Sequence, residues 1–320
     1  MRHGFVLGKF MPPHLGHVHL CETARQLVDR LTILVCWLPD DPIPGPLRLQ
    51  WMKGLFPECR VLGHDAVVPQ APEESPDFWP IWRGIVRAAH PEPIDMVFAG
   101  EDYGLRLAEE VGAAFTPVAP RPFPGLSGPA VRADPWSHWQ GLPQPVRSHY
   151  ARTICLHGPE STGKSTLSAP LAAHFDTLWV PEYGRAHCEL FGTELDDAGL
   201  VTIGRTQSAM TRAARPWCNR RLVVDTDALT TAAWSLMILD QVPDGLFEDF
   251  EKADLYLLTD IDIPWHQDGG RYFPDPADRQ RFMDVCVQVL EEAGAHWVKL
   301  GGRNDARLRT AIAAVERLKP

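Results

Sequence analysis

The stretch Gly158-Pro159-Glu160-Ser161-Thr162-Gly163-Lys164-Ser165 decides the fold of the half of the chain that contains it. It has the phosphate-loop spacing G-x-x-x-x-G-K-[ST]. Residues 153–157 before it are apolar and rich in β-formers, and residues 164–174 after it have the apolar periodicity of a helix. A strand, this loop and a helix together are the context in which the motif binds nucleotide phosphates. A glycine-rich turn without a ligand is the alternative, and it leaves the flanking strand and helix unexplained.

The residue types in the loop suit a bound triphosphate. Glycine at the first and sixth positions lets the backbone curl, so that its N–H groups and the helix N-terminus face phosphate oxygens. Lys164 can then reach the β- and γ-phosphates as a catalytic cation, and Ser165 can hold Mg²⁺. The predicted ATP-binding residues of the loop are Gly158, Glu160, Ser161, Thr162, Gly163, Ser165 and Thr166.

Length and charge limit the classes of protein to consider. The chain has 320 residues, which predicts two domains. Its formal net charge of −10 argues against general binding to nucleic acids or anionic membranes, because such surfaces are usually basic. No apolar run approaches the roughly 20 residues that cross a bilayer, and the N-terminus has no signal-peptide pattern, so we expect a cytoplasmic protein. The seven cysteines are scattered and predict neither disulfides nor a zinc site.

Strands and helices are predicted to alternate in both halves of the chain. Of the 30 prolines, 21 precede residue 151, and their clusters at 39–46, 69–80 and 117–124 predict loops. The alternation favours an α/β fold with two doubly wound parallel-sheet domains. The linker is predicted near 141–150, which gives domains 1–147 and 148–320. The predicted strands are 5–7, 31–38, 94–99, 153–157, 178–180, 221–225, 254–259 and 297–300, and the predicted helices include 17–30 and 103–111.

The first half carries a glycine turn followed by two histidines. After the predicted strand come Gly8, Lys9 and Phe10, and then His14-Leu15-Gly16-His17 at a helix start. Gly16 permits a close approach of the backbone, and two imidazoles beside a helix N-terminus suit a polyphosphate. Such a site can stabilise the charge that develops during phosphoryl transfer.

The second half carries acidic residues where strands end. Asp225 and Asp227 follow an apolar strand, and we expect Asp225 to lie on the magnesium side and Asp227 or Glu182 to align a substrate hydroxyl. Glu182, Tyr183 and Arg185 follow another strand and are predicted to bind the acceptor. The polar segment 262–271 has the glycines of a closing lid, and its Arg271 is a candidate for contacting ATP; Arg279 and Arg281 follow it.

The first-half block resembles the nucleotidyltransferase signature G-x-F-x-P-x-H-x-G-H. A second element of those enzymes, S-x-T-x-x-R, is matched by Ser127-Gly128-Pro129-Ala130-Val131-Arg132, in which Pro129 replaces the expected threonine. One hydroxyl contact is therefore in doubt, but proline suits a first helical turn and Arg132 keeps the charge that grips phosphate.

Taken together, the motifs resemble the NadR family of bifunctional nicotinamide mononucleotide (NMN) adenylyltransferase/ribosylnicotinamide kinases over almost the whole chain. The blocks that carry the resemblance are 8–17, 41–45, 77–82, 127–132, 158–166, 182–185, 225–227, 263–265 and 268–269. It implies a Rossmann-like nucleotidyltransferase followed by a P-loop kinase. Some members carry a helix-turn-helix segment before the first domain; here a strand is predicted within a few residues of Met1, so repressor activity is not expected.

The resemblance implies two ATP-dependent steps. The second domain would phosphorylate ribosylnicotinamide with Mg²⁺ held by Ser165 and Asp225, and the first would transfer AMP to NMN, giving NAD and pyrophosphate. His14, His17, Lys9 and Arg132 would stabilise the leaving pyrophosphate. Trp79 and Trp82, in or beside proline-rich loops, would contact the pyridinium ring or act as core residues under those loops. The expected ligands are small molecules rather than nucleic acid or membrane, and a homo-oligomer is compatible with the sequence.

Two other functions remain open at this point. One is a P-loop kinase fused to an adenylyltransferase for another phosphate acceptor, such as a pantetheine-type phosphate. The other is a nucleotide-sensing protein without turnover, which Pro129 favours and which Lys164, the strand-end acids and the histidine pair oppose.

Overall fold

The computed structural model describes residues 1–118, 123–265 and 272–320. The chain divides into two compact units, Met1–His149 and Tyr150–Pro320. Where an irregular linker was predicted, the chain forms a short 3₁₀ helix, η2 (Trp139–Gly141), and helix α6 (Gln144–Tyr150). Helix α6 is possible there because Pro145 lies in its first turn, where the missing N–H costs no hydrogen bond. Within the described residues, no helix is long and apolar enough to cross a membrane.

The first unit contains a five-stranded parallel sheet in the order β3-β2-β1-β4-β5. The strands are β1 (His3–Gly8), β2 (Arg30–Cys36), β3 (Arg60–His64), β4 (Met96–Ala99) and β5 (Ala114–Pro117). Alternating side chains enter different cores: Val6 and Ile33 pack with α1 and α2, whereas Phe5 and Leu34 pack with α3 and α4. The strand order reverses between β1 and β4, and the carboxyl ends at such a point are where open α/β sheets bind ligands.

The helices of the first unit include two that the sequence did not predict, at residues 45–55 and 78–89. The helices are α1 (Leu15–Leu27), α2 (Gly45–Leu55), α3 (Phe78–Ala89), α4 (Tyr103–Val111) and α5 (Gly128–Ala133), with the 3₁₀ helix η1 (Pro72–Glu74). The expectation of a loop around Trp79 and Trp82 is wrong, because both lie on α3. Pro80 sits in the first turn of α3, where it does not interrupt the hydrogen-bond ladder.

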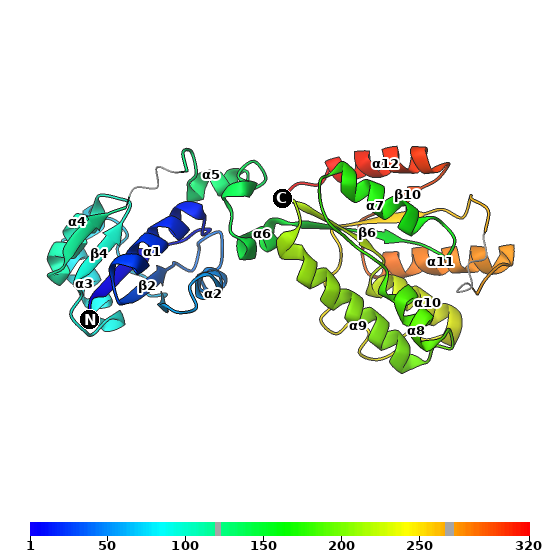
Figure 1. Cartoon of the computed structure of the whole chain (residues 1–320), viewed down its shortest axis with the longest axis horizontal. Coiled ribbons are helices and arrows are strands. Elements are labelled where there is room, and N and C mark those ends of the chain that lie inside the picture. Colours follow the sequence, from blue (N-terminus) through cyan, green and yellow to red (C-terminus); the bar gives the residue numbers. More distant parts are fainter. Residues whose placement is uncertain (119–122, 266–271) are drawn as a thin grey trace. The chain divides into compact units, whose positions relative to one another are not determined.

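The second unit contains a parallel sheet in the order β10-β9-β6-β8-β7. Helices α7 and α12 cover one face and α10 and α11 the other (Figure 1). Leu167, Leu171 and Ala172 of α7 are buried, which agrees with the apolar periodicity of residues 164–174. The two sheets confirm the predicted fold class. The elements are β6 (Arg152–His157), α7 (Lys164–His174), β7 (Trp179–Val180), α8 (Tyr183–Phe191), α9 (Asp197–Ala214), η3 (Arg215–Trp217), β8 (Arg221–Asp225), α10 (Ala228–Leu239), β9 (Leu255–Thr259), α11 (Pro276–Glu292), β10 (Trp297–Leu300) and α12 (Asn304–Glu316).

Candidate active sites

The phosphate loop connects β6 to α7, as the sequence predicted. Gly158 and Gly163 have φ values of 133° and 82°, in the region that favours glycine. A Cβ atom on Gly158 would lie 2.8 Å from Oγ1 of Thr259 and 2.9 Å from its carbonyl oxygen. Glycine is therefore required at residue 158 because β9 passes directly against the loop.

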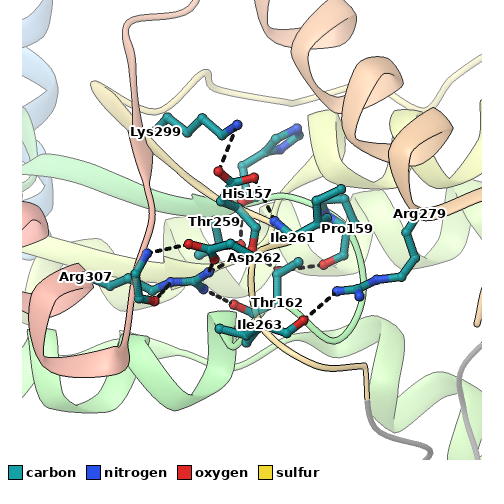
Figure 2. Close-up of polar contacts among 12 residues, drawn as sticks. His157, Pro159, Thr162, Thr259, Ile261, Asp262, Ile263, Arg279, Lys299 and Arg307 are labelled. Carbon is teal, nitrogen blue, oxygen red and sulfur yellow. Dashed lines mark hydrogen bonds and ion pairs between the residues drawn. The ribbon is translucent and has the colours of Figure 1, made fainter. Parts of the chain in front are cut away.

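Polar contacts hold the loop in its curled shape. The Lys164 ammonium donates hydrogen bonds to the carbonyl oxygens of Gly158 at 2.9 Å and Pro159 at 2.8 Å. The Thr162 hydroxyl donates to the carbonyl of Pro159 at 2.7 Å and lies 2.6 Å from the hydroxyl of Thr259 (Figure 2). The loop is thus tied both to itself and to the end of β9.

Asp225 ends β8, the strand next to β6, and the Ser165 hydroxyl at the start of α7 lies near its carboxylate. Burial raises the pKa of Asp225 above its ordinary value, although Ser165 and Lys164 oppose that rise. Its Oδ1 atom is buried and has no hydrogen-bond partner among the described residues. Since an unpartnered buried oxygen is costly, this atom is well suited to a cation or a cation-bound water.

Asp227 has a different environment from Asp225. Its Oδ1 accepts the backbone N–H groups of Leu229 at 3.0 Å and Thr230 at 3.2 Å, so it caps the N-terminus of α10. Its Oδ2 accepts the Tyr256 hydroxyl at 2.6 Å. The structure therefore uses both carboxylate oxygens of Asp227 within the domain, whereas the sequence offered this residue or Glu182 for a substrate hydroxyl.

A cavity of about 450 Å³ lies beside the phosphate loop and joins it to an acceptor side. From the loop it is lined by residues 160–166, and from α8 by Glu182 and Arg185, both predicted to bind the acceptor. The sequence did not identify Thr230, Thr231 and Trp234, on one face of α10, or Tyr272. For the three α10 residues the sequence did contain a signal: they follow the two strand-end acids at a spacing that places them on one face of a helix. The rings of Trp234 and Tyr272 lie 5.6 Å apart. Tyr183 does not line the cavity; its ring lies 5.9 Å from that of His187.

Glu160 faces the segment that carries Tyr272. Its carboxylate accepts the backbone N–H of Tyr272 at 3.0 Å from each oxygen and that of Phe273 at 2.6 Å. The indole N–H of Trp265 lies 3.3 Å from the same carboxylate. Glu160, predicted to bind ATP, thus also connects the loop to the acceptor wall.

Three arginines were associated with the predicted lid. Arg271 lies outside the described residues. Arg279 donates to the carbonyl of Ile263 at 3.1 Å, and Arg281 forms an exposed ion pair of 3.0 Å with Asp240. The Arg281 pair is a surface contact of the kind that contributes little to stability.

The histidine pair of the first unit forms the N-terminal cap of α1. Nδ1 of His14 accepts the backbone N–H of Gly16 at 3.1 Å, and Nδ1 of His17 accepts that of His14 at 3.2 Å. Burial lowers the pKa of His14 to about 4 and that of His17 well below its ordinary value. Both rings are therefore neutral at pH 7. Because each Nδ1 is an acceptor, each proton is on Nε2, which can donate to a ligand.

Lys9 is held by a buried acid–arginine pair. Its ammonium lies 3.7 Å from Oδ1 of Asp41, and Oδ2 of Asp41 accepts Arg48 at 2.6 Å. Arg48 is fully buried and also donates to the carbonyl of Lys9 at 2.7 Å. The pair thus fixes both the backbone and the charged end of Lys9.

Ser127 and Arg132 occupy the two ends of α5. The Ser127 hydroxyl accepts the N–H of Ala130 at 3.3 Å, and Pro129 lies in the first turn, as predicted. Arg132 donates to the carbonyl of Met11 in the β1–α1 turn. Arg132 is therefore brought next to the turn that carries the histidines.

A second cavity, of about 890 Å³, lies at the carboxyl ends of β1 and β4. Trp79 and Trp82 line it, as do Tyr103 and Arg106, which the sequence did not identify. The Tyr103 hydroxyl donates to the carbonyl of Leu7 at 2.7 Å. All predicted site residues of the first unit line this cavity: Gly8, Lys9, Phe10, His14, Gly16, His17, Trp79, Trp82, Ser127 and Arg132.

Comparisons with known proteins find one family match in the second unit and relatives that cover almost the whole chain. Residues 153–307 match the family described as "AAA domain". The chain is 28% identical to NadR of Escherichia coli strain K12, described as a trifunctional NAD biosynthesis/regulator protein, over 98% of this chain and 83% of that one. It is also 28% identical to the NadR of Salmonella typhimurium strain LT2, over 92% of this chain and 78% of that one.

Solved structures of NadR share the fold of the whole chain. A NadR protein in complex with NR has a TM-score of 0.78 and 21% identity, and covers 99% of this chain and 96% of that one. A NadR protein in complex with NAD and AMP-PNP has a TM-score of 0.77 and 22% identity, with 98% and 95% covered. The resemblance to NadR predicted from the motifs is therefore confirmed along both domains.

Proposed function

We propose that this chain, which resembles the NadR proteins over both of its domains, makes NAD in two ATP-dependent steps. In the first step, the C-terminal domain phosphorylates the 5′-hydroxyl of ribosylnicotinamide. In the second, the N-terminal domain joins the resulting NMN to the AMP part of ATP and releases pyrophosphate.

The observation that carries the kinase proposal is the single cavity that contains both the phosphate loop and an acceptor wall. A γ-phosphate on the loop and a hydroxyl near Glu182 would share one cavity, and positioning of this kind supplies much of the catalysis in phosphoryl transfer. Glu182 follows β7 and supplies a carboxylate on the acceptor side of this cavity. We therefore propose that Glu182, rather than Asp227, aligns the hydroxyl. Lys164 would neutralise charge on the phosphates.

Ser165, at the start of α7, and Asp225, at the end of β8, fit a magnesium ion. The Ser165 hydroxyl and the unpartnered Oδ1 of Asp225 are oxygen ligands, and Mg²⁺ is commonly bound by one or two such groups together with nucleotide phosphates. The ion would neutralise charge on the transferring phosphoryl group. A bound cation would also oppose the burial that raises the pKa of Asp225.

The aromatic residues of the cavity suit a cationic ring. Trp234 and Tyr272 form a corner of aromatic faces, and a pyridinium ring carries the positive charge that such faces attract. This supports ribosylnicotinamide over an uncharged nucleoside as the acceptor.

The N-terminal cavity supports direct adenylyl transfer. An NMN phosphate can attack the α-phosphorus of ATP without a protein nucleophile, while Lys9, Arg132 and the Nε2–H groups of His14 and His17 stabilise the leaving pyrophosphate. Trp79 and Trp82 provide aromatic surface in the same cavity.

Product analysis tests both steps. The purified chain is incubated with Mg-ATP and either ribosylnicotinamide or NMN. We expect NMN and then NAD from the riboside, and NAD with pyrophosphate from NMN. Absence of NAD from the NMN reaction contradicts the adenylyltransferase, and absence of NMN and NAD from the riboside reaction contradicts the kinase.

A further inference from the structure

Arg307 is a fully buried arginine directly behind the phosphate loop, and the sequence motifs do not include it. It lies near the start of α12 with 1% of its surface exposed. Removing an arginine from water is costly unless its N–H groups are satisfied. Its burial therefore depends on the hydrogen bonds that its guanidinium group makes.

The Arg307 guanidinium joins three separate segments of the second domain (Figure 2). It donates to the carbonyl of Gly302 at 2.9 Å, after β10, and to that of Asp260 at 2.8 Å, after β9. A third bond goes to the carbonyl of Thr162, within the phosphate loop. The planar fork of an arginine suits this role because its donors point in fixed directions.

Asp262 supplies the negative charge that balances Arg307. Its Oδ1 accepts a hydrogen bond from the guanidinium, and its Oδ2 accepts the backbone N–H of Gly302. Burial alone would raise the pKa of Asp262, but these two contacts outweigh it and hold the pKa below its ordinary value. The pair is thus charged, and Asp262 fixes the same glycine turn that Arg307 contacts.

The bond to Thr162 has a consequence for the next peptide group. In a trans peptide the carbonyl and the following N–H point in opposite directions, so anchoring the Thr162 oxygen behind the loop turns the Gly163 N–H away from Arg307. Gly163 lines the cavity that we assign to the phosphates. Its φ of 82° belongs to a backbone region that glycine enters freely, so this peptide needs an external anchor to keep one orientation.

We propose that Arg307, with Asp262 as its counter-ion, is a positioning residue that aims the Gly163 N–H at the bound triphosphate. This inference rests on the proposed kinase function.

The test compares Arg307→Lys with Arg309→Lys in steady-state phosphorylation of ribosylnicotinamide. Arg309 is a matched control because it lies on the same helix and its ion pair with Asp305 is exposed. We expect Arg307→Lys to raise the KM for ATP about tenfold, the effect of losing one or two hydrogen bonds from a charged donor, with the KM for the riboside unchanged. Arg309→Lys should change neither value.

A merely structural role would give a different result. Arg307→Lys would then lower the melting temperature and the amount of active protein while the KM for ATP stayed at the wild-type value, and this outcome overturns the proposal.

Asp262→Asn keeps the proposal testable if Arg307→Lys does not fold. It should raise the KM for ATP by a smaller factor, about threefold, through loss of the counter-ion, and no rise in this variant contradicts the proposal.

A binding measurement separates this inference from the kinase assignment. If the wild-type chain does not phosphorylate ribosylnicotinamide, the proposed function fails, but Mg-ADP binding by equilibrium dialysis still tests Arg307. A His17→Ala background is used because this change should weaken nucleotide binding to the proposed site of the first domain. In that background Arg307→Lys should weaken ADP binding about tenfold relative to Arg309→Lys, and equal binding by the two variants overturns the inference.

Discussion

Glu160 of the phosphate loop holds the backbone of Tyr272, whose ring lines the acceptor side of the same cavity. Each carboxylate oxygen of Glu160 lies 3.0 Å from the Tyr272 backbone nitrogen, and the two residues are 112 positions apart in the chain. The loop that would bind ATP and the wall that would bind the second substrate are therefore joined by one side chain.

This contact predicts that Glu160→Ala impairs acceptor binding more than nucleotide binding. The backbone N–H groups of residues 272 and 273 lose a charged acceptor, a loss of about 1.5–3 kcal/mol for each fully lost bond. The Tyr272 ring would then leave the cavity wall. Steady-state kinetics should show a rise of about tenfold or more in the KM for ribosylnicotinamide, with a smaller change in the KM for ATP.

Two substitutions at Tyr272 control the interpretation. Tyr272→Ala should reproduce the Glu160→Ala effect on the riboside, because both remove the ring from the wall. Tyr272→Phe keeps the ring and loses only the hydroxyl contact with the carbonyl of Thr193, so it should stay near wild type. If Glu160→Ala raises only the KM for ATP, the carboxylate acts on the nucleotide rather than on the wall.

Mutation of Asp225 should impair kinase turnover, whereas mutation of Asp227 should impair stability. Asp225→Asn removes a buried charge with an unpartnered oxygen, so it should preserve stability while lowering the kinase turnover by about 100-fold or more. Asp227→Ala removes a helix cap and leaves the Tyr256 hydroxyl without its acceptor, at a cost of about 1–3 kcal/mol. Thermal unfolding and kinase assays on both variants check this. Equal melting temperatures for the two would contradict the assignment.

The sequence predicted the phosphate loop and the histidine turn because each is a local pattern with a strand before it and a helix after it. It placed Asp225 on the magnesium side but did not predict the capping role of Asp227, which depends on the left-handed turn at Thr226, with a φ of 75°. Tyr272 and Arg307 were missed for a related reason. Each acts on the loop from more than 100 positions away, and such contacts arise only when the sheet brings the segments together.

The low pKa values of the histidine pair predict a pH-dependent stability in the first domain. The unfolded chain binds protons on His14 and His17 near pH 6.5, whereas the folded domain holds them neutral to about pH 4 or below. Stability is therefore complete above pH 6.5 and falls as the pH drops from 6.5 toward 4, by at most about 1.4 kcal/mol per pH unit for each histidine.

The variant His14→Asn tests this pH dependence. Asparagine keeps an N-cap acceptor but does not titrate, so the melting temperature should fall less between pH 7.5 and 5 than in the wild type. Adenylyl transfer should be lost at both pH values, because the Nε2–H donor is missing. A melting temperature with the same pH dependence in both proteins would show that His14 does not titrate as described.

The Asp41–Arg48 pair predicts a positioning effect on Lys9. Burial alone would raise the pKa of Asp41, but the Leu38 N–H and Arg48 hold it below its ordinary value, so Asp41 is charged. Asp41→Asn should release the Lys9 ammonium and lower the kcat/KM of adenylyl transfer roughly tenfold, with the kinase unchanged. Asp40→Asn, at the exposed neighbouring position, is the matched control. An equal loss in the two variants would argue for a general charge effect.

The aromatic corner of the kinase cavity predicts discrimination by ligand charge. Trp234 packs on Phe282 at 4.7 Å between ring centroids and lines the cavity beside Tyr272. If its face binds a pyridinium, the cationic riboside should bind better than the uncharged dihydropyridine riboside of nearly the same shape, by about 0.5–2 kcal/mol or roughly 2- to 30-fold in KM. Trp234→Phe should keep much of this preference, and Trp234→Leu should abolish it by weakening the cationic substrate alone. Parallel weakening of both ribosides in Trp234→Leu would mean that the indole contributes only apolar surface.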